Sequence, residues 1–90
     1  MADLEDEIAN LERVWREHEI DNYKDILESC NDLLDRAGET TLQQRVIAVL
    51  AGVIAEIEEV NDPLVSEYLG DWGTRPYWET AIGRPLPNAT

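Results

Sequence analysis

Residues 42–60 read LQQRVIAVLAGVIAEIEEV, and this stretch decides the fold. Its apolar residues recur at steps of three and four, which places them on one side of an α-helix. The residues on that side are Leu42, Val46, Ile47, Val49, Leu50, Val53, Ile54, Ile57 and Val60. The opposite side holds the small residues Ala48, Ala51, Gly52 and Ala55 instead of charges. A helix with so little polar surface has to be covered on more than one side, so we expect it to be the central element.

Two amphipathic helices are expected before this segment. In residues 4–19 one narrow apolar stripe is formed by Leu4, Ile8, Leu11 and Trp15, and Asp3 is placed to cap the first turn. In residues 21–37 a wider stripe is formed by Tyr23, Ile26, Leu27, Cys30, Leu33 and Leu34, and Gly38 stands where helices commonly end. The join near residues 19–22 has no glycine or proline, which leaves a continuous helix open.

Short sequence signals mark both ends of the central helix. Thr40 with Gln43, or Thr41 with Gln44, fits a capping box at its start. Asn61-Asp62-Pro63 ends it and begins a new short helix, because proline disfavours helical geometry in the residue before it and suits the first helical position. That short helix is expected to run to residue 69, where Gly70 closes it.

The chain divides by composition into a helical part and a tail. Residues 61–90 hold all four prolines of the chain, whereas residues 1–60 hold none. We therefore expect an all-α fold, with a helical bundle domain over residues 1–70 that contains three helices and a short fourth one. Residues 71–90 are expected to form an irregular aromatic, proline-rich C-terminal tail that packs on the bundle or on a partner. One more helical turn is possible over residues 76–82.

Charge and cysteine usage narrow the class of protein. The chain has 20 acidic and 7 basic residues and a net charge of −13. Such a charge opposes direct binding to nucleic acid and to anionic membranes, which attract lysine and arginine. The single Cys30 fits a reducing compartment, and the first residues lack the basic and apolar regions of a signal peptide. These features predict a cytoplasmic protein.

The candidate catalytic residues favour ordinary structural roles. His18 lies between Glu17 and Glu19 on a charged helix, and Cys30 lies in an apolar stripe without a partner histidine. Asp32 and Asp35, with Glu56 and Glu59, are two carboxylate pairs that could face each other and hold magnesium in a metal-dependent hydrolase. Solvated carboxylates are the more common case. The sequence therefore predicts a protein that is not an enzyme, with no catalytic, cofactor or metal site.

The C-terminal part of the chain concentrates its aromatic residues. Tyr68, Trp72, Tyr77 and Trp78 fall close together and alternate with glycine, arginine and proline. Tryptophan, tyrosine and arginine are enriched at binding hot spots, because they bury much area and keep a polar end. The same residues could instead close the open side of the chain's own bundle. The pattern leaves both possibilities open.

The leading hypothesis is a non-catalytic protein–protein interaction module, or a small accessory subunit of a larger assembly or homo-oligomer. Its partner-binding residues would lie on the apolar helix 42–60 and on the aromatic tail. They are Val49, Leu50, Val53, Ile54, Ile57, Tyr68, Trp72, Tyr77 and Trp78. The alternative is an acidic inhibitor, either an immunity protein or a nucleic-acid mimic, that binds a basic protein surface through the first two helices.

Overall fold

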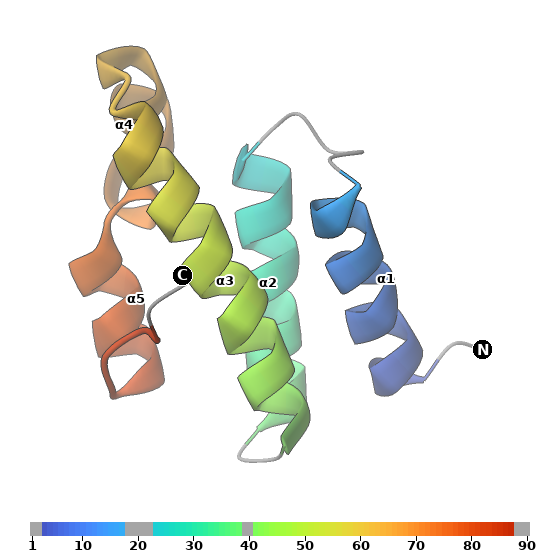
Figure 1. Ribbon diagram of the computed structural model, residues 1–90. Coiled ribbons are helices and arrows are strands. Elements are labelled where there is room, and N and C mark those ends of the chain that lie inside the picture. The colour runs from blue at the N-terminus through green and yellow to red at the C-terminus, as the bar shows by residue number, and fades with distance from the viewer. Residues whose placement is uncertain (1–2, 18–22, 39–40, 88–90) are drawn as a thin grey trace.

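The central helix of the fold is α3 (Thr41–Val60), on which the other helices pack (Figure 1). The computed structural model describes residues 3–17, 23–38 and 41–87, and in these ranges every regular element is helical. The all-α class, the three long helices and the short fourth helix are thus confirmed. The other elements are α1 (Leu4–Arg16), α2 (Tyr23–Ala37), α4 (Pro63–Leu69), the 3₁₀ turn η1 (Gly70–Gly73) and α5 (Arg75–Ile82).

The helix ends follow from local chemistry. The Asp3 carboxylate accepts a hydrogen bond of 2.9 Å from the backbone N–H of Asp6, as expected for the cap of α1. Helix α1 ends at Arg16, earlier than the expected residue 19, and Glu17 is its C-cap. Gly38 ends α2 with a φ of +59°, a conformation that glycine adopts without strain. Asp62 caps α4 through the N–H of Leu64 at 2.9 Å.

Two of the expected boundary features fall outside the described residues. The join between α1 and α2, with the question of a continuous helix, lies in residues 18–22. The capping box of Thr40 with Gln43 includes a residue outside the described ranges as well. Thr41, the cap in the alternative box with Gln44, is the first residue of α3.

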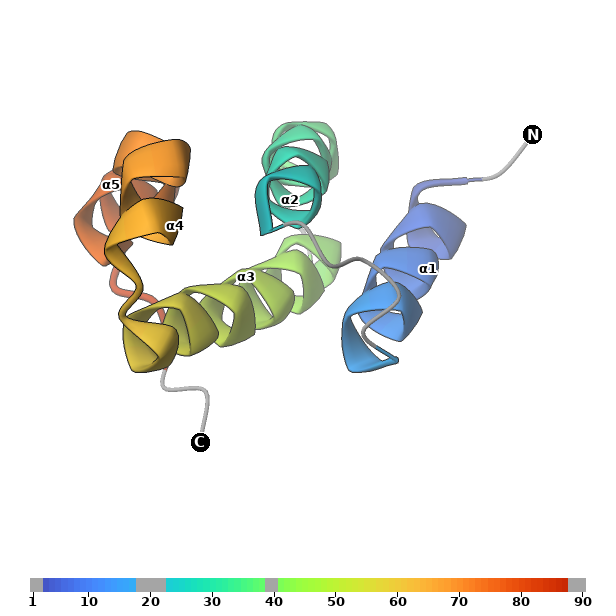
Figure 2. The same cartoon turned by 90° about the horizontal axis from the view of Figure 1, so that it is seen from above.

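The hydrophobic core gathers along α3. Its residues that face the neighbouring helices are almost fully buried, as the spacing in residues 42–60 predicts. They pack against Ile8 and Leu11 of α1 and against the apolar stripe of α2. Figure 2 shows α1 and α2 side by side across α3, with α4 and α5 together at the other end. Burial of these apolar side chains is the main source of stability in a chain this short.

The small-residue side of α3 is covered in part by the chain itself. The indole ring of Trp15 lies against Gly52, with Nε1 3.1 Å from the point that a Cβ on Gly52 would occupy. Ala51 is buried in the same core, and Ala48 is exposed. The small residue at position 52 thus allows a large aromatic side chain of α1 to approach the backbone of α3 closely.

The C-terminal part is more regular than expected and belongs to the same core. Residues 70–87 contain the 3₁₀ turn and the eight-residue helix α5, which covers the possible helical turn over residues 76–82. Trp78 of α5 is fully buried, and its Nε1 donates a hydrogen bond of 2.7 Å to the carbonyl oxygen of Trp72. Leu86 is buried too. Trp78 and Leu86 of this segment thus pack in the core of the chain itself.

Polar contacts hold the C-terminal segment in place. The guanidinium of Arg75 donates to the carboxylate of Glu58 on α3, at 2.8 Å for the shorter bond. The backbone N–H of Leu86 donates to the carboxylate of Glu79 at 2.9 Å. A small hollow lined by Gln44, Ile47 and the segment 84–87 shows that the chain then runs back beside the first turns of α3. In the described ranges, none of the helices has the length and apolar character needed to cross a membrane.

Candidate protein-binding site

The residues of α3 that were expected to bind a partner lie inside the chain. Val49, Leu50, Val53, Ile54 and Ile57 all belong to the buried core. The spacing correctly indicated a covered helix face, and what covers it here is α1, α2 and the residues around Trp78. A partner could reach these side chains only if the bundle opened.

The aromatic residues of the C-terminal part divide into two groups. Trp78 is fully buried, and Trp72 is half-buried against it, with ring centroids 5.7 Å apart. Tyr77 meets the Trp78 ring edge-on at 5.1 Å and accepts a hydrogen bond from Nε1 of Trp72, yet it keeps an exposed side. Tyr68 is 60% exposed. Trp78 therefore serves the core, whereas Tyr68 and part of Tyr77 remain open to solvent.

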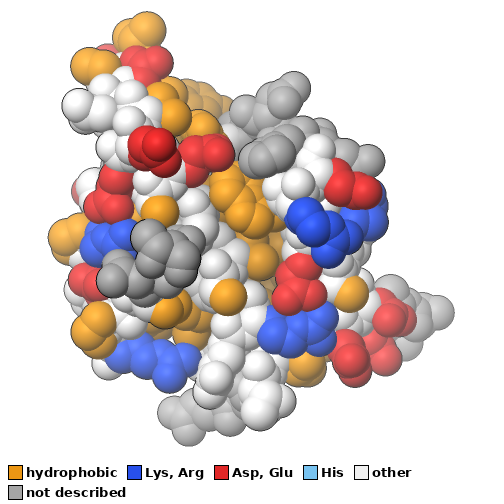
Figure 3. All heavy atoms as spheres, in the orientation of Figure 1, with side chains coloured by type: hydrophobic (Ala, Val, Ile, Leu, Met, Phe, Trp, Pro, Cys, Tyr) orange, Lys and Arg blue, Asp and Glu red, His pale blue; other side chains and the backbone are white. Residues whose placement is uncertain are grey.

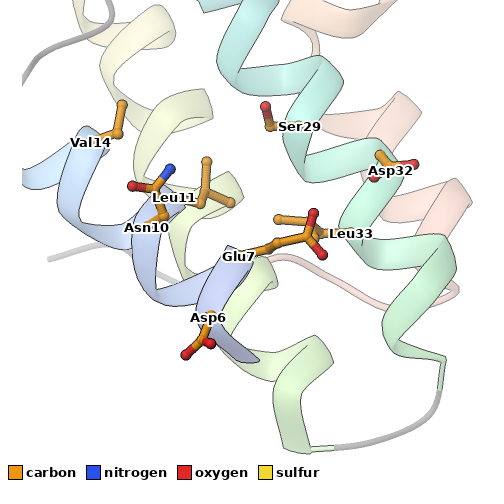
Figure 4. Close-up of a pocket in the computed structure, with 8 residues that line it drawn as sticks. All are labelled: Asp6, Glu7, Asn10, Leu11, Val14, Ser29, Asp32 and Leu33. Atoms are coloured by element: carbon orange, nitrogen blue, oxygen red, sulfur yellow. The ribbon is translucent and has the colours of Figure 1, made fainter. Parts of the chain in front are cut away.

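Between α1 and α2 the helices leave an open groove of about 340 Å³ (Figure 4). Its floor is apolar and narrow, because the residues that form it, Leu11, Val14 and Leu33, are at most 9% exposed. Figure 4 shows Leu11 and Leu33 between the two helices. Its rim is polar: α1 supplies Asp6, Glu7 and Asn10, and α2 supplies Ser29 and Asp32. We call this surface, formed by the eight residues just named, the α1–α2 groove.

An arginine of the chain itself pairs with two of the rim carboxylates. The guanidinium of Arg36 on α2 donates through both terminal nitrogens to the Glu7 carboxylate of α1. Its Nη1 also donates to the Asp32 carboxylate at 3.2 Å. All three side chains keep substantial exposure to solvent. The carboxylates of Glu7 and Asp32 thus bind one guanidinium together, across the gap between two helices.

The electrostatics of these side chains follow from that pairing. The hydrogen bonds from Arg36 lower the pKa of Glu7 below its ordinary value of 4.5. The bonds to Glu7 and Asp32 raise the pKa of Arg36 above its ordinary value. Both groups are therefore charged at neutral pH. The Glu7 carboxylate keeps its negative charge even in mildly acidic solution.

The opposite side of α1 is closed by another ion pair. Arg45 of α3 donates to both carboxylate oxygens of Glu12, at 2.5 and 3.2 Å, and lies 3.8 Å from Glu5. Figure 3 shows acidic and basic side chains mixed over α1 on this side. Helix α1 is thus held to α2 by Arg36 and to α3 by Arg45, and the groove lies on the side of α1 that faces α2.

A second surface exposes apolar side chains at the tip formed by α4. Leu64 is 74% exposed and lies one helical turn before Tyr68, so the two share one helix face. Figure 3 shows hydrophobic side chains gathered at this tip, at the upper left. The Lys24 ammonium lies 5.6 Å from the centroid of the Tyr68 ring. We call Leu64 and Tyr68 the α4 patch.

The residues considered for catalysis have structural surroundings. Cys30 is buried, and burial raises the pKa of its thiol to about 12, which makes it unreactive. Asp32 pairs with Arg36, and Glu56 accepts a hydrogen bond from Tyr23, which helps to raise the pKa of that phenol after burial itself. Within the described ranges no three potential ligands come close enough to hold a metal ion. His18 lies outside those ranges.

Three floor residues and five rim residues therefore make a surface that the sequence did not single out. Leu11 and Leu33 were assigned to apolar stripes, and Val14 was not. A signal was present, because Val14 follows Leu11 by three residues and widens the stripe of α1 toward α2. The distance between α1 and α2, which decides whether the stripe is covered, could not be predicted from that spacing.

Comparison with known proteins finds no match to a family model, to a curated protein or to a solved structure.

Proposed function

We propose that the chain is a non-catalytic protein-binding module that holds a segment of a partner protein in the α1–α2 groove. The observation that carries this proposal is the groove between α1 and α2, in which charged and polar side chains border a narrow apolar floor. An apolar centre with a polar rim is the common arrangement of protein–protein interfaces. A cytoplasmic location fits the reduced Cys30 thiol in the core.

The shape of the groove favours a protein segment over a small molecule. Small-molecule sites are enclosed and combine apolar walls with a few buried polar groups that fix orientation. Across the described residues the core contains no buried polar or charged side chain, and the polar groups of the groove all lie at its rim. Because the groove is open along its rim, a row of side chains from a partner segment can lie in it.

The same surface supports a second candidate function, an inhibitor of a basic protein. The specific observation is the acidic character of the rim at Asp6, Glu7 and Asp32, together with the net charge of −13. The two functions share the binding surface and differ in whether the partner loses an activity when it is bound. An assay of the captured partner, with and without this chain, separates them.

The test is site-specific photo-cross-linking in cells that produce the full chain. A photoreactive amino acid replaces the rim residue Asn10 or Ser29 in two variants, and the exposed Ala48 outside the groove in a matched control. We expect a defined cross-linked partner from both rim positions and a much weaker one from position 48. The adduct should disappear when Val14→Lys places a charge in the floor. Equal adducts from all three positions, or none from the rim, would contradict the proposal.

A further inference from the structure

We infer that the occupant of the α1–α2 groove is a basic amphipathic helix whose arginine replaces Arg36 on the carboxylates of Glu7 and Asp32. This inference rests on the proposed function and specifies the partner's chemistry. It combines three features of the groove: its length, its apolar floor and the guanidinium already bound to its rim.

The length and floor of the groove fit one face of a short helical segment. The lining residues of α1 run from Asp6 to Val14, which at 1.5 Å per residue spans about 12 Å. That distance corresponds to about two turns of a helix lying along the groove. Two or three apolar side chains at helical spacing would cover the small exposed parts of Leu11, Val14 and Leu33.

The rim selects the sign of the partner's charge. Asp6, Glu7 and Asp32 line the groove, and a chain of net charge −13 surrounds it. A partner with lysine or arginine beside its apolar stripe is attracted to this rim. A second copy of the same chain would bring the same negative charge into contact with it, and an acidic peptide or a nucleic acid would be repelled.

The internal ion pair shows which cation the rim accepts. Glu7 receives two hydrogen bonds from one guanidinium, and Asp32 receives a third from the same group. This planar, forked geometry is specific to arginine, since a lysine ammonium cannot bridge two acceptors in the same way. Because the Arg36 side chain is 42% exposed, exchanging it for a partner's arginine swaps one solvated ion pair for another at little net cost.

If a partner's arginine replaces Arg36, removal of Arg36 should have the opposite effect from most substitutions at a binding site. Removing Arg36 should strengthen binding, because the partner's arginine then meets carboxylates that no internal cation occupies. Loss of any positive charge makes the chain more negative and should also strengthen binding of a basic partner, but to a smaller extent. The matched control is Arg84→Ala, which removes one positive charge from the exposed C-terminal segment, away from the groove.

The experiment measures binding of a fluorescein-labelled synthetic amphipathic helix of about 16 residues, with leucine on one face and arginine on the flanks. Fluorescence anisotropy at physiological salt gives its Kd with the full chain. The rim variant Asp6→Asn/Glu7→Gln/Asp32→Asn is compared with a matched variant that neutralises the exposed acids Glu59, Glu67 and Asp71 elsewhere. Circular dichroism verifies that each variant is folded.

We expect the rim variant to bind at least about tenfold more weakly than the wild type, and the matched variant to change less than about threefold. Arg36→Ala should bind the peptide about threefold more tightly than the wild type does. Arg84→Ala should increase the affinity by a smaller factor. A peptide of the same composition in scrambled order, or one with lysine for arginine, should bind more weakly than the designed one. Equal loss in the two triple variants, or weaker binding by Arg36→Ala, would overturn the inference.

The outcomes also separate the inference from the proposed function. If the peptide does not bind and rim cross-links to a protein still form, the module stands and the basic helix is wrong. If sedimentation shows that the chain pairs with itself through the groove, a second copy is the occupant and the inference fails. If neither cross-links nor peptide binding depend on the groove, both proposals fail.

Discussion

The indole nitrogen of Trp15 on α1 lies 3.1 Å from the position that a Cβ on Gly52 of α3 would take. This contact joins the first helix to the central one at a point where a side chain on residue 52 would press against the indole ring. We expect it to help set how α1 lies on α3, and through that the separation of α1 from α2.

The variant Gly52→Leu should destabilise the fold by about 1–3 kcal/mol, because the new side chain overlaps the Trp15 ring. Ala48→Leu, one turn earlier on the same helix and exposed, should change the free energy of unfolding by less than about 0.5 kcal/mol. Urea denaturation followed by circular dichroism measures both. If Gly52→Leu is tolerated as well as Ala48→Leu, Trp15 does not set the approach of α1.

The buried indole of Trp78 should be essential to the fold. Trp78→Ala removes a fully buried ring and should cost about 3–5 kcal/mol, enough to unfold much of a chain this small. Tyr77→Phe removes only the acceptor for Nε1 of Trp72 and should cost about 0.5–1.5 kcal/mol. Thermal unfolding measures the difference. A fully stable Trp78→Ala variant would show that α5 does not complete the core.

The thiol of Cys30 should resist alkylation while the chain is folded. Burial raises its pKa to about 12, so little reactive thiolate forms at pH 8 and the reagent has no access to it. We expect iodoacetamide to label Cys30 at least about 100-fold more slowly in buffer than in denaturant. Mass spectrometry over time gives both rates, and similar rates would mean that α2 opens readily.

Acidification should remove the contribution of two carboxylate–arginine pairs. Arg36 lowers the pKa of Glu7, and Arg75 lowers the pKa of Glu58, through hydrogen bonds to the charged carboxylates. Because both values lie below the ordinary 4.5, their stabilising effect is present above about pH 4.5 and is lost as the pH falls through the lowered values. The melting temperature should therefore drop in this range.

The matched comparison isolates these pairs from the rest of the acidic surface. Relief of repulsion among the other carboxylates acts in the opposite direction as the pH falls. The drop below pH 4.5 should be smaller in Glu7→Gln/Glu58→Gln than in Glu59→Gln/Glu67→Gln, which neutralises exposed acids of the same type. Identical pH profiles of the two double variants would mean that the ion pairs contribute nothing measurable.

Most of the fold was accessible from the sequence because local signals agreed with the tertiary structure. The three- and four-residue spacing of α3 matches its buried face, and Asp3 and Gly38 mark helix ends as their chemistry predicts. The helix α5 was harder to predict. The sequence indicated only a possible helical turn over residues 76–82, because eight residues are too few to form a helix by themselves and this one is held by the burial of Trp78 in the core.

The candidate site was less accessible, for a physical reason. Periodicity shows that Val53 and Ile54 must be covered, and it does not show whether the cover is Trp78 of the same chain or another molecule. The groove depends on the separation of α1 and α2, which we expect to be set in part by contacts such as Trp15 with Gly52 between residues far apart in sequence. The role of Arg36 as a bridge from α2 to Glu7 likewise appears only once the two helices are placed together.

The most direct measurement is a titration of the ¹⁵N-labelled chain with the arginine-bearing amphipathic peptide, followed by amide chemical shifts. If the α1–α2 groove is the binding surface, the largest shifts should fall on residues 6–14 of α1 and 29–36 of α2. The rim variant Asp6→Asn/Glu7→Gln/Asp32→Asn should lose them. Shifts centred on Leu64 and Tyr68 of the α4 patch, or no saturable shifts at all, would contradict a binding groove between α1 and α2.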